Sequence, residues 1–273
     1  MQSDVHADRY LSGRELWGDD FTAAQISQWF EDEREGYSEL CGPDASAENY
    51  GYHGINRFYG FRKLPPRRFS HALGIGSSFG GEFLPLLDSI DRITILEPSA
   101  RLRSTVLRDV PVEYVDPTPS GAAPFDTGTF DLVLCLGVLH HIPNVTYVLS
   151  EIGRVMAPGG WALIREPVVS MGDWRRPRKP GITKRERGIP RRILESAVTG
   201  SGMSIRSSLF CISPLTSRIG KAIRVNPCAS QLGAALDRTL ALATAWNYRY
   251  HAEHAWQKVC PSSVYITAQR NAK

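Results

Sequence analysis

From His71 to the end of the chain, short apolar runs alternate with helix-like runs, and this alternation constrains the fold more than any other feature. Runs typical of buried strands are HALGI, RITIL, VEYV, DLVLCL and WALIRE. Between them, apolar residues recur at helical spacing near residues 80–87, 99–109 and 144–156. Strands that alternate with helices form a parallel sheet covered on both faces. The sequence therefore predicts a doubly wound α/β fold.

The segments on either side of this core indicate a cap and an insertion. Within residues 14–40 the sequence predicts one amphipathic helix that Thr22 caps and that ends near Gly36. A loop-like stretch leads from it to a Pro-Pro pair. We expect residues 1–69 to form a helical cap and residues 70–273 a Rossmann-like domain, interrupted by an insertion at about 168–192. The remaining expected elements are a helix over 189–198, a strand over 204–212, a helix over 230–256 and a strand over 262–269.

Composition excludes several classes of protein. Hydrophobic residues make up 42% of the chain and charged residues 22%, and no segment approaches the roughly 20 apolar residues of a membrane span. The first residues contain acids and no apolar core of a secretory signal, so we expect a cytoplasmic protein. None of the five cysteines forms a pair at Cys-x-x-Cys spacing, so we expect reduced thiols and no zinc site. The sequence also has no cluster of acids and histidines at metal-ligand spacing, so we expect no other metal.

A glycine-rich turn, HALGIGSSFGGEF, joins the first predicted strand to a helix. Gly74, Gly76 and Gly80 leave backbone N–H groups open to a ligand at a helix start. A dinucleotide pyrophosphate or the carboxylate of S-adenosylmethionine would suit this turn, as would a purely structural role. A dinucleotide fingerprint requires a third glycine where Phe79 stands, which weakens the dinucleotide interpretation.

The next strand ends in Glu97, followed by Pro98, about 20 residues beyond the first glycine. A carboxylate at this place can accept hydrogen bonds from both ribose hydroxyls of an adenosine. The alternative is a solvated or capping charge. The spacing favours a nucleoside cofactor.

The run FDLVLCLGVLHHIPN, followed by VMAPGGWALIRE, distinguishes the two cofactors. With the glycine turn and Glu97, the chain over residues 70–167 resembles the class I S-adenosylmethionine-dependent methyltransferases. The resemblance implies a seven-stranded sheet with an antiparallel last strand, S-adenosylmethionine as cofactor and S-adenosylhomocysteine as product. It also implies positions for cofactor-binding residues: Gly74, Gly76, Ser77 and Gly80 in the loop, Glu97 and Pro98 at the ribose, Asp116 near the adenine, and Leu136 and Gly137 beside the methyl group.

One position departs from this family. Many members carry an acid two residues before the first glycine, where this chain has Ala72. Another group must then meet the ammonium of the cofactor. Candidates are His71, Glu82 and residues of the cap.

Transfer of a methyl group to an alcohol needs collinear reactants and a base for the proton. Histidine has a suitable pKa, and His140 and His141 follow the fourth predicted strand, at the sheet edge where ligands collect. Of the two we expect His140 to be the base and the other to pack beneath the loop. His53, in the predicted cap, is a further candidate. Each of these three histidines could instead be structural. Nearby Tyr52 has an aromatic face that can contact a sugar or a sulfonium, or pack within the cap.

The insertion carries nine Arg or Lys residues against two acids. A clustered positive charge at the substrate side indicates an anionic substrate, unless the charges are merely solvated. Proline and glycine within it argue against a membrane-binding helix, and we do not expect nucleic acid as the main partner. The predicted substrate-binding residues here are Trp174, Arg175, Arg176 and Arg178.

Together these features predict a methyltransferase that acts on a hydroxyl of a sugar or glycan precursor with an anionic, phosphate part. The general layout resembles methyltransferases of polysaccharide and surface-glycan biosynthesis. Two alternatives stay open: a small-molecule, natural-product or quinone-type methyltransferase, and a degenerate fold that binds RNA or a protein through the basic segment. The sequence does not define the oligomeric state.

Overall fold

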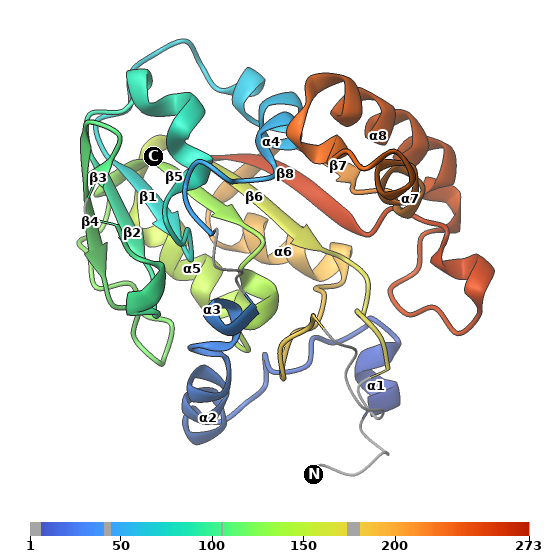
Figure 1. The fold of residues 1–273 in the computed structure, drawn as a ribbon. Helices are drawn as coiled ribbons and strands as arrows, with labels where there is room; N and C mark the ends of the chain where they lie inside the picture. Colours follow the sequence, from blue (N-terminus) through green and yellow to red (C-terminus); the bar gives the residue numbers. More distant parts are fainter. Residues whose placement is uncertain (1–6, 41–44, 105, 174–180, 273) are drawn as a thin grey trace.

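The protein forms a single mixed sheet at its centre (Figure 1). The computed structural model describes residues 7–40, 45–104, 106–173 and 181–272. The sheet has eight strands in the order β3-β4-β2-β1-β5-β6-β8-β7, in which β3 is the short edge strand Val106–Leu107. Its main strands are β1 (Ala72–Ile75), β2 (Ile93–Leu96), β4 (Val110–Val115), β5 (Phe130–Leu136), β6 (Met156–Pro167), β7 (Met203–Cys211) and β8 (Ser263–Arg270). Strands β4, β2, β1, β5 and β6 pair in parallel, and β8 lies antiparallel between β6 and β7. The predicted α/β sheet with an antiparallel last strand is confirmed.

The edge of the sheet beside β4 differs from expectation. The helix predicted over 99–109 is wrong: the segment holds a 3-10 turn, η4 (Ala100–Leu102), and the short strand β3 (Val106–Leu107). Strand β3 pairs antiparallel with β4 through a tight turn at Arg108, whose φ is 53°. Burial of Leu107 against the sheet outweighs the helical spacing, so the sheet has eight strands instead of seven.

Helices cover both faces of the sheet, as a doubly wound fold requires. One face packs on α5 (Val145–Val155) and α6 (Arg191–Gly200), which contribute Leu149 and Leu194 to one apolar core. The other face packs on α4 (His53–Tyr59), the 3-10 helix η3 (Gly81–Ser89) and α8 (Gln231–Thr244). A further helix, α7 (Pro214–Ile223), was not predicted. It begins where Ser213 caps it and Pro214 occupies its first turn.

The predicted first helix is present and ends at Glu33, close to the expected end near Gly36. Helix α2 (Ala23–Glu33) begins at Thr22, whose side chain and Gln25 form a capping box, as expected. It is followed by α3 (Gly36–Leu40), after a break before the glycine. Two more short elements, α1 (Ala7–Leu11) and η2 (Phe61–Lys63), complete the part that precedes β1. The proposed division into a cap of residues 1–69 and a main domain stays a prediction.

Near the C-terminus, the helix predicted over 230–256 ends at Thr244. Three 3-10 turns are interspersed in this part of the chain: η6 (Pro227–Ala229), η7 (Ala245–Asn247) and η8 (Ala255–Lys258). The Asn247 side chain donates hydrogen bonds to the carbonyls of Trp256 and Val259, and these bonds hold a loop where the helix was expected. In the part of the chain that the structure describes, no helix has the length and apolar character of a membrane span.

Candidate functional site

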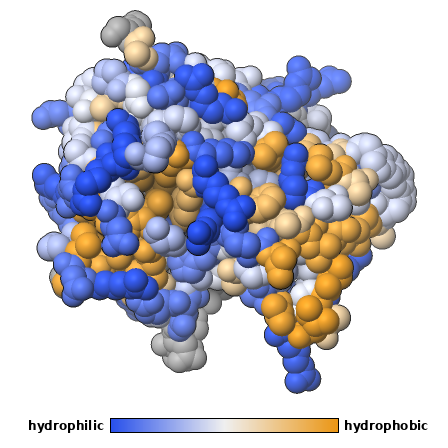
Figure 2. Space-filling view, turned by 90° about the horizontal axis from the view of Figure 1, so that it is seen from above, coloured by the Kyte–Doolittle hydropathy of each residue, from blue (hydrophilic) through white to orange (hydrophobic). Residues whose placement is uncertain are grey.

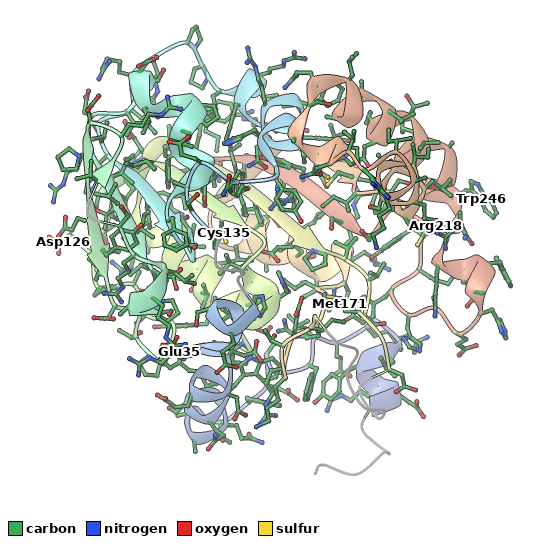
Figure 3. The ribbon with its side chains drawn as sticks, viewed as in Figure 1. Glu35, Asp126, Cys135, Met171, Arg218 and Trp246 are labelled. Carbon is green, nitrogen blue, oxygen red and sulfur yellow. The ribbon has the colours of Figure 1, made fainter. Side chains whose placement is uncertain are left out.

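A cavity of about 1260 Å³ opens at the carboxyl ends of the parallel strands. It lies between the glycine loop, the cap and the segments that follow β6 and α8. Figure 3 shows Glu35 of the cap and Met171 of the segment after β6 on this side of the sheet. Ligands of open α/β sheets bind at this edge.

The glycine loop lies against the wall of the cavity. Gly76 has a φ of 56°, and a Cβ atom there would lie 2.8 Å from the side chain of Val138. A Cβ at Gly74 would come within 2.4 Å of the Ser77 hydroxyl. Only glycine fits either place without displacing a neighbour. Gly76 and Ser77 line the cavity directly, whereas Gly74 and Gly80 support the turn from behind.

Glu97 also lines the cavity, together with Pro98. Its carboxylate accepts hydrogen bonds from the backbone N–H groups of Ser78 (3.1 Å) and Ser99 (3.0 Å), and burial raises its pKa. It is therefore held rigidly beside the glycine loop, as a ribose-binding acid must be. Asp116 lies elsewhere: its exposed side chain pairs with Arg103 and does not line the cavity.

Glu82 is the candidate that replaces the missing acid at Ala72. His71 bonds Thr94 (2.9 Å) and does not line the cavity, whereas Glu82 lines it and is 5% exposed. Burial raises the pKa of Glu82 to about 7, against the opposing effects of the Ser77 hydroxyl and Arg165. A buried carboxyl group of this kind is stabilised in its charged form by a cation in the cavity.

Arg165 is a cavity residue that the sequence reasoning missed. It is buried at the end of β6, donates hydrogen bonds to Asn56 (3.0 Å) and the Leu136 carbonyl (3.2 Å), and lies 4.1 Å from the centre of the Tyr52 ring. Among the described residues no carboxylate forms an ion pair with it. A buried cation without a carboxylate favours an anionic ligand group. Tyr52 itself lines the cavity, as does Gly137 nearby.

The two histidines occupy the turn η5 (Leu139–His141) and differ in their partners. Nδ1 of His140 lies 2.8 Å from a carboxylate oxygen of Glu166, and Nε2 lies 3.4 Å from Glu186. Although burial opposes its charged form, these two carboxylates raise the pKa of His140 to about 9. His140 is thus a buried cation near neutral pH. A protonated imidazole with both nitrogens engaged is poorly placed to accept a proton.

His141 has the opposite character. Burial and the neighbouring His140 charge lower its pKa, so it is neutral. Its Nδ1 lies 2.9 Å from Glu33 of α2, and its ring lines the cavity. A carboxylate at Nδ1 orients an imidazole and leaves Nε2 for proton transfer.

Hydrogen bonds join the cap to η5 and to residues 181–188 next to His140 and His141. Trp29, fully buried, donates its indole N–H to the His141 carbonyl (2.7 Å). Glu33 accepts hydrogen bonds from the Thr183 hydroxyl (2.5 Å) and the Arg185 backbone N–H (2.6 Å). Three separate segments therefore close this end of the cavity.

His140, His141 and Glu186 also offer ligand atoms within 4.8 Å of one another, close enough to share a metal ion. Hydrogen bonds with Glu166, Glu33 and each other already engage these atoms. We therefore describe the group as a hydrogen-bonded cluster.

The remaining predicted residues lie apart from the cavity or outside the described residues. His53, at the start of α4, packs against Tyr50 and does not line the cavity, and its Nδ1 is buried without a hydrogen-bond partner among the described residues. The expected substrate-binding residues Trp174, Arg175, Arg176 and Arg178 lie outside the described ranges.

Three of the described cations of the insertion bind the protein itself. Lys184 and Arg185 pair with Asp32, and buried Arg187 donates to the carbonyls of Trp17, Leu139, His140, Ile142 and Pro143. In contrast, Arg249 and Lys258, which the sequence did not single out, line the cavity. They supply positive charge at a different place from the one predicted.

Comparisons with known proteins agree with this geometry. Residues 73–164 match the family model of a methyltransferase domain. Over 96 residues the chain is 29% identical to the sterol 4-C-methyltransferase strm-1 of Caenorhabditis elegans, a match that covers 33% of this chain and 29% of that protein. This chain thus spans less than a third of the relative's length.

Two solved structures share the fold. The [4+2]-cyclase SpnF has a TM-score of 0.56 at 13% identity, with 95% of this chain and 100% of that chain covered. The N-methyltransferase NodS of Bradyrhizobium japonicum, in complex with S-adenosylhomocysteine, has a TM-score of 0.54 at 12% identity, with 88% and 98% covered. At such low identity these two structures establish the architecture alone.

Residues 73–164 thus match a methyltransferase domain, and the fold of the chain is that of the class I S-adenosylmethionine-dependent methyltransferases. The family predicted from the sequence is confirmed, and S-adenosylmethionine is the cofactor that this family assignment gives the chain.

Proposed function

We propose that the protein transfers a methyl group from S-adenosylmethionine to an oxygen of its acceptor. The observation that carries this proposal is one cavity that joins the glycine loop and Glu97 to a neutral, oriented imidazole at His141. The cofactor would supply the electrophilic methyl group. Gly76, Ser77 and Glu97 hold it, with Pro98, Leu136 and Gly137 along the same wall.

The two ends of the cofactor's amino acid would meet opposite charges. Glu82 receives the ammonium group and thereby takes over the role that Ala72 cannot perform. Arg165 offers its buried guanidinium to the carboxylate. Both side chains are held within the protein, so little reorganisation accompanies binding.

His141 is the base in this proposal, and Glu33 orients it through Nδ1. His140 instead holds the turn η5 in place, because its protonated ring contacts both Glu166 and Glu186. Closure of the cap over this pair excludes water, which protects a sulfonium from hydrolysis and strengthens the electrostatic contacts.

For the acceptor we propose a hydroxyl of a sugar or glycan precursor that carries phosphate. Arg249 and Lys258 support an anionic part, since both cations line the cavity. The sterol methyltransferase match covers only 33% of this chain and gives no support to a particular acceptor.

The test is the formation of S-adenosylhomocysteine with a panel of phosphorylated and nucleotide-linked sugars, each paired with its uncharged counterpart. We expect turnover with a charged acceptor and a large loss with its uncharged partner. Equal turnover with both members of each pair would refute the anionic acceptor. Turnover only with quinone-type phenols would favour the small-molecule alternative.

A further inference from the structure

An apolar and cationic surface lies on the side of the molecule formed by α7 and α8, outside the cavity. Figure 2 shows hydrophobic side chains gathered on this side, at the right of the view, with hydrophilic ones among them. Leu232 is 85% exposed, Ile223 63% and Val225 53%. Ile219 and Leu236 extend the same surface, which we call the α7–α8 patch. Exposed apolar residues clustered in this way mark an interaction site.

The exposed charges within residues 213–236, which carry most of the α7–α8 patch, all have one sign. From residue 213 to residue 236 the sequence contains Arg218, Lys221 and Arg224 and no acid. All three cations are exposed. The next acid, Asp237, is buried and accepts hydrogen bonds from the backbone N–H groups of Ile212 and Ser213. The exposed charge of this face is therefore purely positive among these residues.

An exposed tryptophan lies on the same side of the molecule as the α7–α8 patch. Trp246, just after α8, is 80% exposed, and Figure 3 shows it on the side of the molecule that also presents Arg218. Tryptophan, leucine and basic residues on one exposed face are the composition of segments that lie in the headgroup region of a membrane.

We propose that the α7–α8 patch docks the protein on the surface of an anionic lipid bilayer. The apolar side chains would enter the headgroup region, and Arg218, Lys221 and Arg224 would contact lipid phosphates. This partner accounts for the apolar residues and for the uniform charge together. Docking would also bring the cavity close to the bilayer, because Ile212 and Pro214 at the start of α7 line it.

A second copy of the chain suits this face less well. In a twofold dimer the same patch faces itself. Arg218, Lys221 and Arg224 would then face their own counterparts, and residues 213–236 supply no acid to pair with them, which is a repulsive arrangement.

The test is sedimentation of the purified protein with vesicles of phosphatidylcholine alone and of phosphatidylcholine mixed with phosphatidylglycerol. We expect binding to the anionic vesicles, weaker binding to the neutral ones, and a decline in binding as the salt concentration rises.

The double variant Ile223→Asp with Leu232→Asp should bind at least tenfold more weakly to the anionic vesicles. The double variant Lys221→Gln with Arg224→Gln should lose the dependence of binding on phosphatidylglycerol. Val106→Asp is the matched control, because Val106 is 49% exposed on β3, far from the patch in sequence.

Absence of binding to anionic vesicles would overturn the proposal, as would equal binding by the patch variants and the control. A dimer in solution that the patch variants dissociate, without vesicle binding, would overturn it in favour of self-association. Thermal unfolding and S-adenosylhomocysteine binding show whether each variant is folded. Because vesicle binding does not require the cofactor, its failure is separate from a failure of the proposed methyl transfer.

Discussion

The two ends of the cavity are built in different ways. At the cofactor end, the glycine loop, Glu97 and Pro98 come from two neighbouring strand ends. At the closing end, Glu33 of the cap, the histidines of η5, Glu166 of β6 and Glu186 of the insertion converge from four distant segments. The first is local and repeats a family pattern, whereas the second depends on tertiary packing. We infer that the cofactor end determines the class of chemistry and the closing end its proton transfer and acceptor.

The largest expected effect concerns the closing end. His141→Gln should reduce methyl transfer by roughly 10²- to 10⁴-fold, the usual contribution of a general base, and leave S-adenosylhomocysteine affinity unchanged. The measurement is single-turnover methyl transfer, with calorimetry for affinity. His254→Gln, at an exposed site, is the control. A rate that depends on His140 and not on His141 would reverse the roles of the two histidines.

Arg187 tests whether the closing end also holds the fold together. Arg187→Met leaves buried carbonyls of Trp17, Ile142 and Pro143 without their donor, so the free energy of unfolding should fall by about 3–5 kcal/mol. Denaturant unfolding measures this change. The exposed Arg192→Met should change it by no more than about 0.5 kcal/mol. If both variants changed the free energy of unfolding by a similar amount, the hydrogen bonds of Arg187 would not be important for stability.

A substitution of Glu82 tests how the cofactor end binds the ammonium group. Glu82→Gln should weaken S-adenosylhomocysteine binding about tenfold, or about 1.4 kcal/mol, because it removes the charge that meets the ammonium group. Binding of 5′-methylthioadenosine, which lacks the amino acid, should not change. Calorimetric titration with both ligands separates the two effects. Equal losses for both ligands would mean that Glu82 supports the fold of the pocket instead of binding the ammonium.

A further effect is a pH dependence of stability that arises from His140. Its pKa in the folded state is raised to about 9 from an ordinary value near 6.5, so its stabilisation is complete below pH 6.5 and is lost as the pH rises through 9. The groups that face it are Glu166, Glu186 and His141. The pKa of Glu186 is lowered to about 2, so that carboxylate stays charged throughout this window.

Urea unfolding of the wild type and of His140→Gln at pH 6 and at pH 9.5 measures this dependence. The wild type should lose stability relative to the variant as the pH rises. A difference between the two proteins that does not change with pH would contradict the assignment of His140 as a buried cation.

Prediction from sequence succeeded where interactions are local. The strands, the glycine turn and Glu97 follow from alternation and spacing over short stretches, and the structure brings Gly76 and Glu97 into one cavity. Arg165 was missed because it lies within a strand whose sequence indicates only burial. Its role becomes visible through Asn56 and Tyr52, more than 100 residues earlier in the chain.

The closing end shows the same limit. The basic residues of the insertion indicated an anionic ligand, yet Lys184 and Arg185 pair with Asp32, which a count of charges in the segment could not reveal. Likewise, the sequence favoured His140 as the base, because it could not show which partners the two adjacent histidines have. Their distinct carboxylate partners make one a cation and the other a neutral imidazole.

The central claim is that this cavity binds S-adenosylmethionine through the glycine loop and Glu97. Calorimetric titration with S-adenosylmethionine and with S-adenosylhomocysteine, repeated on Glu97→Ala and on the surface control Glu113→Ala, tests it most directly. We predict micromolar binding that Glu97→Ala weakens at least tenfold, about 1.4 kcal/mol, and that Glu113→Ala leaves unchanged. Failure of the wild-type protein to bind either ligand would contradict the account and would favour a degenerate fold that binds another partner.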